Sequence, residues 1–146
     1  MKGAYPDHGK DLYGWAIHTA ELLRNKKMDE VDFDNIVEEI ETLGRSEQHE
    51  LTNRLSLVIA HLLKWQYQPE KRTRSWILTI EEQRIQAKFC LKVSPSLKSK
   101  LNEILENAYE IGKIKAAKET FLDTKTFPQQ CDYSFDQIMD DSFYPV

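Results

Sequence analysis

The sequence is poor in the residues that interrupt helices and in those that cross-link small proteins. Its 146 residues include only five glycines, five prolines and two cysteines. No apolar run approaches the ~20 residues that a transmembrane helix needs, and the N-terminus lacks the apolar core of a signal peptide. Cys90 and Cys131 lie far apart in no metal-ligand spacing, which favours reduced thiols. These absences argue against a membrane span and a disulfide scaffold, and we expect a cytoplasmic protein.

Helical periodicity runs along nearly the whole chain, and runs of β-branched residues are short, so the sequence predicts an all-α protein. A chain of 146 residues fits one domain that can bury its own core. We therefore expect a single helical domain over residues 1–146, built as a bundle of four long helices plus a short C-terminal helix. Residues 1–10 are expected to be flexible, and residues 123–146 to pack on the bundle as a tail.

Capping residues and prolines indicate where the first two helices begin and end. Asp11 can cap a first helix that ends near Lys26. A long segment, 34–67, follows and ends before Pro69, because the residue before a proline avoids the α region. Gly44 is a candidate break in this segment, but a break there leaves little room for a turn. One long helix is therefore favoured over two.

Similar signals place the remaining helices. The third helix is expected to begin at Thr73 or Ser75, and the fourth at the Ser-Pro pair 94–95, because proline is favoured at the first helical position. Ser134 and Gln137 have the spacing of a capping box, which predicts one or two helical turns in the tail. The apolar markers of the third helix are Ile77, Ile80, Ile85 and Phe89.

The net charge of −4 conceals two segments of opposite charge. Residues 28–50 carry nine acidic residues against Arg45, whereas residues 64–100 carry nine basic residues against three acidic ones. Such segments favour self-association or, for the basic one, binding of a polyanion. Alternatively, the acidic and basic residues lie on solvated helix faces and pair with one another within one chain.

Four charged residues of the acidic segment are candidate structural polar groups. Glu38 and Glu41 share one helical face, as carboxylates do in the metal sites of helical bundles. The Glu-x-x-His pattern of a di-iron site is absent, so we expect no metal and interpret both as a solvated face, with Arg45 as a partner. Glu47 falls where the apolar stripe changes register, and if it points inward it needs an arginine or hydrogen-bond donors, because an unpaired buried carboxylate costs several kcal/mol. The candidate arginines are Arg24, Arg45 and Arg54, and a catalytic or ligand-holding role for Glu47 is the alternative.

Arg54 and His61 are the candidate catalytic pair. Seven residues apart on one helix, they share a face about 10 Å apart along the axis. The pair resembles the Arg-x(4–6)-His signature of HEPN ribonucleases, which are all-helical and metal-independent, although Leu55 stands where that signature usually has a polar residue. An imidazole can take the proton of an RNA 2′-hydroxyl while a guanidinium stabilises the phosphate. Alternatively, His61 is a structural residue that is packed in the core.

The segment 61–76, HLLKWQYQPEKRTRSW, concentrates aromatic and basic side chains. Aromatic side chains beside arginines bind single-stranded nucleic acid. However, Glu70 interrupts the basic run, and the pI of about 5.6 is far below that of typical nucleic-acid-binding domains. A packed helix–helix corner is the favoured interpretation, and a nucleic-acid site or a protein-docking surface is the alternative. The candidate binding residues are Lys64, Tyr67, Lys71, Arg72, Arg74 and Trp76.

Six blocks of the chain resemble a bacterial family, especially abundant in cyanobacteria, known as domain of unknown function 29. The blocks are DLYGW (11–15), ELLRNKK (21–27), EEIETLGRSE (38–47), HLLKWQYQPEKRTRSW (61–76), SPSL (94–97) and FPQQCDYSFDQI (127–138). The resemblance covers nearly the whole chain. It implies a compact helical fold in a bacterial cytosol, and it implies no activity.

The common catalytic and cofactor-binding motifs, namely the P-loop, GxGxxG, GxSxG, CxxC and HExxH, are all absent, and we expect no cofactor. The leading hypothesis is a non-enzymatic interaction module that forms a homo-oligomer or binds a protein partner through the segments 28–50 and 64–100. One alternative is a metal-independent ribonuclease of toxin or defence type that uses Arg54 and His61. The other is a nucleic-acid-binding protein that uses the basic and aromatic corner.

Overall fold

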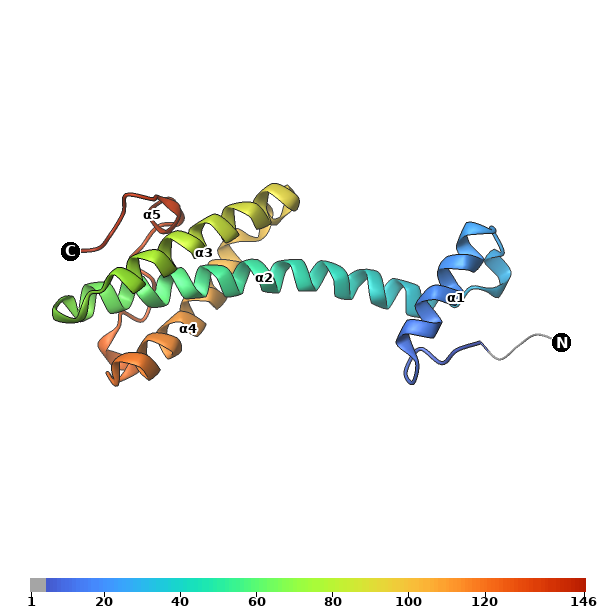
Figure 1. The fold of residues 1–146 in the computed structure, drawn as a ribbon, viewed down its shortest axis with the longest axis horizontal. Coiled ribbons are helices and arrows are strands. Elements are labelled where there is room, and N and C mark those ends of the chain that lie inside the picture. Colours follow the sequence, from blue (N-terminus) through green and yellow to red (C-terminus); the bar gives the residue numbers. More distant parts are fainter. Residues whose placement is uncertain (1–4) are drawn as a thin grey trace. The chain divides into compact units, whose positions relative to one another are not determined.

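The computed structural model describes residues 5–146, which contain helices and no β-strand (Figure 1). The prediction of an all-α bundle with four long helices and a short C-terminal one is confirmed. None of the helices in this range combines the length and the apolarity that a membrane crossing requires. The helices are α1 (Leu12–Arg24), α2 (Phe33–Tyr67), α3 (Arg74–Val93), α4 (Leu101–Thr120) and α5 (Phe135–Met139), with short 3₁₀ segments η1 (Met28–Glu30), η2 (Pro69–Lys71), η3 (Pro95–Lys100) and η4 (Thr124–Thr126).

Several helix ends follow from local capping. The Asp11 carboxylate accepts a hydrogen bond from the backbone N–H of Gly14 at the start of α1, and Thr73 caps α3 in the same way. The capping box predicted for the tail is present at the start of α5.

The start of the fourth helix differs from the prediction. Residues Pro95–Lys100 form the 3₁₀ segment η3, and α4 begins only at Leu101. Ser94 makes no side-chain capping bond. Its hydroxyl donates instead to the carboxylate of Glu47 on α2, with 3.4 Å between Oγ and Oε2. Ser94 and Pro95 thus hold the predicted N-cap and first positions, but of η3 rather than of an α-helix.

The long helix α2 is unbroken over its 35 residues and passes through Gly44 without interruption. A Cβ atom at Gly44 would meet no atom within 4 Å, so packing does not require glycine there. Gly112 of α4 is different, because a Cβ atom there would lie 3.1 Å from the carbonyl oxygen of Ser56 and 3.0 Å from Ile59 Cγ2. The absence of a side chain at Gly112 thus lets α4 approach α2 closely.

The chain divides into two compact units, Met1–Gly44 and Arg45–Val146, which we call the N-terminal unit and the C-terminal unit. The helix α2 contributes its residues up to Gly44 to the first unit and the rest to the second. That both units act as one domain stays a prediction. The expected flexibility of residues 1–10 falls partly on residues 1–4, which lie outside the described residues, whereas Tyr5 and His8 are half-buried.

The C-terminal unit encloses an apolar core of eighteen buried side chains. The helix α2 supplies a stripe spaced by fours and threes, the pattern of an amphipathic helix, that runs from Leu51 to Leu62. The C-terminal tail, residues 123–146, covers this core with Phe127, Tyr133 and Ile138. Burial of these three side chains ties the tail to the bundle.

The N-terminal unit has a much smaller interior. Trp15 and Leu22 are the buried apolar side chains of α1. His8 packs edge-on against Trp15, with 4.7 Å between ring centroids, and its Nε2 lies 2.6 Å from Oε1 of Glu39 on α2. The loop before α1 therefore joins α1 to the first part of α2.

Candidate functional site

The corner between α2 and α3 is held together by its own aromatic and basic side chains. Arg72 donates from Nε to the carbonyl oxygen of Trp65 at 2.9 Å, and its guanidinium lies 4.6 Å from the centroid of the Trp65 ring. Tyr67 packs edge-on against Phe127 of the tail, with 5.2 Å between centroids. These contacts support the interpretation of this segment as a packed corner.

Lys64 is a buried cation within the same corner. Its side chain is almost enclosed, and Nζ donates to Oε2 of Glu119 at 2.5 Å while lying 4.5 Å from the centroid of the Trp76 ring. A nucleic-acid phosphate could reach this ammonium only by breaking both contacts. Lys71 and Arg74 are exposed. Four of the six predicted binding residues thus make contacts within the C-terminal unit, and nucleic-acid binding stays a prediction.

His61 is packed rather than presented to solvent. It is 8% exposed, and its Nδ1 lies 3.0 Å from the carbonyl oxygen of Leu57. Burial lowers the pKa of His61, and the ammonium groups of Lys64 and Lys115 add to this effect, against the hydrogen bond to Leu57 and the carboxylate of Glu119. The imidazole is therefore neutral near pH 7 and enclosed.

Arg54, the other catalytic candidate, makes separate contacts. Its Nη1 donates to Oε1 of Gln83 on α3 at 3.3 Å, and its Nη2 lies 3.6 Å from Oε1 of Glu50. The hollow of about 420 Å³ beside Arg54 is lined by residues that do not include His61. The two side chains do not meet in this hollow, so the geometry gives no support to a shared catalytic site. Ribonuclease activity stays a prediction.

The predicted structural polar residues lie along α2. Glu38, Glu41 and Arg45 are exposed, and Glu47 is half-buried. The donor to Glu47 is the hydroxyl of Ser94 rather than an arginine. Within residues 5–146, no group of three His, Cys, Asp or Glu side chains is placed to hold a metal ion.

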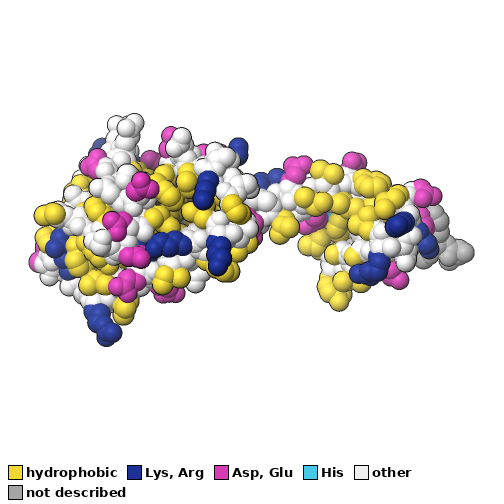
Figure 2. Space-filling view, turned by 90° about the horizontal axis from the view of Figure 1, so that it is seen from above, with side chains coloured by type: hydrophobic (Ala, Val, Ile, Leu, Met, Phe, Trp, Pro, Cys, Tyr) yellow, Lys and Arg dark blue, Asp and Glu magenta, His cyan; other side chains and the backbone are white. Residues whose placement is uncertain are grey.

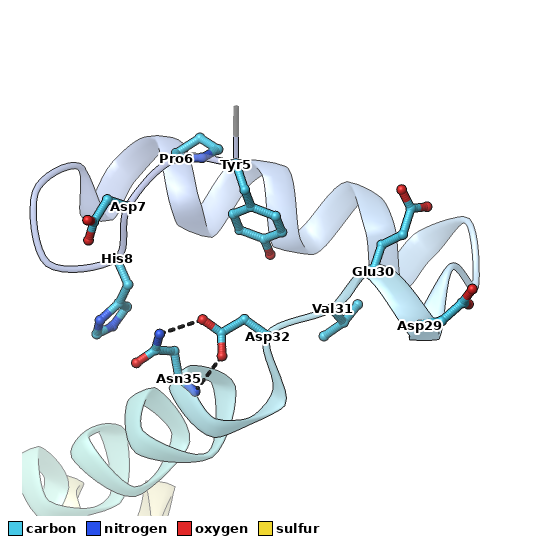
Figure 3. Close-up of a pocket in the computed structure, with 9 residues that line it drawn as sticks. All are labelled: Tyr5, Pro6, Asp7, His8, Asp29, Glu30, Val31, Asp32 and Asn35. Atoms are coloured by element: carbon cyan, nitrogen blue, oxygen red, sulfur yellow. Dashed lines mark hydrogen bonds between the residues drawn. The ribbon is translucent and has the colours of Figure 1, made fainter. Parts of the chain in front are cut away.

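An acidic hollow of about 440 Å³ lies in the N-terminal unit, beside the loop before α1. Asp32 is engaged there as a helix cap, because it accepts from the backbone N–H of Asn35 at 3.3 Å and from its side-chain amide at 2.5 Å. Figure 3 shows Asp29 and Glu30 at the end of the hollow away from His8. The carboxylates do not converge on one point, and the hollow is not built as a cation site.

A second hollow, of about 590 Å³, is lined partly by Cys131 and by the tyrosines Tyr109 and Tyr133. The Tyr109 hydroxyl donates to the carbonyl oxygen of Pro128, and the Tyr133 hydroxyl donates to the Gln66 side chain, each at 2.5 Å. Burial raises the pKa of the Cys131 thiol, so it is not activated as a nucleophile. These groups hold the tail in place and carry no evident chemistry.

The N-terminal unit exposes nine large apolar side chains within residues 5–44. Four of them follow one another along α2 at spacings of four, three and three, and Ile40 among them is 64% exposed. Figure 2 shows hydrophobic side chains gathered on this unit. We call Phe33, Val37, Ile40 and Leu43 the α2 stripe; the other five exposed side chains are Leu12, Tyr13, Ile17, Leu23 and Met28.

The helix α3 carries an exposed apolar face opposite its buried one. Among its predicted apolar markers Ile80 is buried, whereas Ile85 and Phe89 are exposed, Phe89 by 60%. At 3.6 residues per turn, the exposed residues lie about half a turn away from Ile80 and Ala87. Sequence analysis missed this second face, although the spacings of seven and four signal it. We call Leu78, Ile85, Phe89 and Val93 the α3 stripe.

Arg84 is a further residue that sequence analysis missed. It is fully buried, its Nε donates to the carbonyl oxygen of Ile138 at 2.7 Å, and its Nη2 donates to that of Phe143 at 2.8 Å. Both acceptors belong to the C-terminal tail, so Arg84 fastens the tail to α3. The available signal was its spacing from Ile80, which places it near the buried side of α3.

The fold is that of a small all-α protein in which a helical bundle carries exposed apolar helix faces. Residues 8–144 match the model of the family described as domain of unknown function DUF29, and the chain belongs to that family. No curated protein and no solved structure matches the chain. The family match agrees with the resemblance seen in the sequence and supplies no activity.

Proposed function

We propose that this protein is a non-enzymatic interaction module that associates with a second copy of itself in the bacterial cytosol. The observation that supports this most directly is the exposure of the α2 stripe. From Leu51 onward the same helix has its apolar side buried by the C-terminal unit. Exposed apolar patches on a folded protein mark interaction surfaces.

The small interior of the N-terminal unit supports the same proposal. Units of about 40 residues usually need a disulfide, a metal or a partner chain to become stable. Both cysteines, Cys90 and Cys131, are free and belong to the C-terminal unit. Association with another chain would bury the apolar side chains that this unit leaves exposed.

Sedimentation velocity of the purified protein over a wide range of concentration tests the proposal. We expect a species heavier than one chain that Ile40→Glu converts to a monomer, because an unpaired carboxylate is costly to bury. Thr42→Glu, an exposed position on the side of α2 opposite Ile40, is the matched control and should sediment like the wild type. A wild-type protein that stays monomeric at every concentration contradicts the proposal.

The two alternative functions have tests of their own. A ribonuclease of the predicted kind cleaves RNA in the presence of EDTA, and His61→Ala abolishes cleavage while the protein stays folded. A nucleic-acid-binding protein shows an affinity that falls steeply with salt. No cleavage, and no binding at low salt, would remove both alternatives.

A further inference from the structure

Two exposed apolar surfaces of similar make-up lie on different units of the chain. The α2 stripe and the α3 stripe present four large apolar side chains each. Both follow helical spacing, so each is a continuous row on one side of a helix. Two such rows can pack against each other as ridges in grooves.

The charges beside the two stripes are of opposite sign. Residues 33–44 contain four acidic side chains and no basic one, whereas residues 86–100 contain four lysines and no acidic residue. Glu41, one helical turn from Val37, is exposed on α2, and Lys92 and Lys98 are exposed on α3 and η3. Packing of two α2 stripes on each other would bring like charges together, whereas packing of an α2 stripe on an α3 stripe brings opposite charges together.

A hollow of about 360 Å³ is lined in part by Lys92, the neighbour of Val93 in the α3 stripe. Its apolar lining residues are Leu91 of α3 and Phe135 and Met139 of α5, and none of them belongs to the α3 stripe. Lys88 and Lys98 line it as well, and Lys88 also donates to Asp141 at 3.0 Å. Figure 2 shows hydrophobic side chains next to Lys and Arg on the C-terminal unit. A lining of apolar side chains and lysines fits an apolar residue flanked by carboxylates.

From these observations we propose that the α2 stripe of one copy docks on the α3 stripe of a second copy, and that the second copy returns the same contact. This inference rests on the self-association proposed above and names the surface that receives the N-terminal unit. Two such contacts related by a two-fold axis close the pair and leave neither stripe exposed.

The exposed area is sufficient for a stable dimer. A half-exposed large side chain presents on the order of 100 Å². The eight side chains of the two stripes therefore cover on the order of 800 Å² per copy, which is about what each partner buries in an interface of standard size.

The test uses one substitution in each stripe of the full chain. Ile40→Glu disables the α2 stripe and leaves the α3 stripe intact, and Phe89→Glu does the reverse. Each variant alone should lose self-association, with a dissociation constant raised by roughly 100-fold or more. An equimolar mixture should form a mixed dimer, because the intact α2 stripe of the Phe89→Glu chain meets the intact α3 stripe of the Ile40→Glu chain.

Two further variants guard against misfolding and non-specific effects. Val93→Glu, also in the α3 stripe, should behave like Phe89→Glu and should likewise associate with Ile40→Glu. Asn102→Glu, an exposed polar position on α4 outside both stripes, should dimerise like the wild type. Circular dichroism confirms that each variant keeps its helical content.

The outcomes separate this inference from the proposed function. If Phe89→Glu and Val93→Glu dimerise like the wild type, the α3 stripe is not the receiving surface, although self-association stands. The inference also fails if the two complementary variants remain monomeric when mixed. A wild-type monomer at all concentrations removes both the inference and the proposed function.

Discussion

The two units of this chain differ in how much apolar surface they bury. The C-terminal unit encloses eighteen apolar side chains, whereas in the described part of the N-terminal unit Trp15 and Leu22 are buried and nine large apolar side chains are exposed. Both units contain part of α2, whose apolar side is covered from Leu51 onward and bare before Gly44. The apolar side of α2 before Gly44 is thus the surface that the proposed association would cover.

The largest expected effect comes from the arginine that fastens the tail of the C-terminal unit. Arg84→Ala should lower the free energy of unfolding by ~3 kcal/mol, because the buried carbonyls of Ile138 and Phe143 lose their donor and a cavity remains. Urea denaturation followed by tryptophan fluorescence measures this loss. Arg74→Ala, at an exposed position, is the control and should change stability by less than ~0.5 kcal/mol. If Arg84→Ala lowers the free energy of unfolding no more than Arg74→Ala does, Arg84 does not hold the tail.

Replacing a glycine with alanine in each unit tests the difference in packing between Gly112 on α4 and Gly44 on α2. Gly112→Ala should destabilise by ~1 kcal/mol, because the new Cβ atom lies 3.1 Å from the Ser56 carbonyl oxygen and the overpacking outweighs the gain in helix propensity. Gly44→Ala should stabilise by up to ~1 kcal/mol, since its Cβ atom meets open space. Chemical denaturation of the two variants should give changes of opposite sign. Changes of the same sign would contradict the difference in packing.

The buried His61 should make the stability of the C-terminal unit depend on pH. Burial lowers the pKa of His61 in the folded state below the ordinary value of 6.5. As the pH falls through 6.5, the unfolded chain therefore binds a proton that the folded chain does not, and stability decreases until the folded pKa is reached. His61→Gln should remove this part of the pH dependence in denaturation curves recorded between pH 8 and pH 5. If the free energy of unfolding depends on pH equally in the wild type and in His61→Gln, His61 lies in a solvated environment.

The smallest effect concerns the charges beside the α2 stripe. Glu41→Lys should weaken the dimer by about twofold to fivefold, as expected for an exposed ion pair, and added salt should reduce the difference. Sedimentation equilibrium at low and high salt measures both changes. Combining Glu41→Lys with Lys92→Glu should recover part of the loss, because the charges are again opposite. A tighter dimer with Glu41→Lys alone would show that the receiving surface is not basic.

Local signals predicted much of the fold. Asp11, Thr73 and the pair Ser134 and Gln137 cap their helices as expected, because these side chains need only backbone N–H groups one turn away. The start of the fourth helix was predicted only in part, because Ser94 and Pro95 open a helical segment that is 3₁₀ up to Lys100. Ser94 binds Glu47, which is distant in sequence, and local pattern contains no information on that contact.

The candidate site was harder to predict, because helical spacing does not distinguish a buried stripe from an exposed one. Phe33 and Ile40 follow the same period as Leu51 and Leu55, yet only the latter two are covered. The burial of Arg84 depends on carbonyl groups supplied by the tail, and a sequence pattern does not show them.

Hydrogen exchange at two protein concentrations tests most directly whether the N-terminal unit is completed by a second copy. An element with few buried contacts opens locally, and binding raises its protection. We expect the amides of α1 and of residues 33–44 to exchange more slowly at high concentration, while those of Leu51–Leu62 in the core stay unchanged. Exchange in α1 that is equally slow at both concentrations would show that this unit is stable alone and that its apolar face needs no partner.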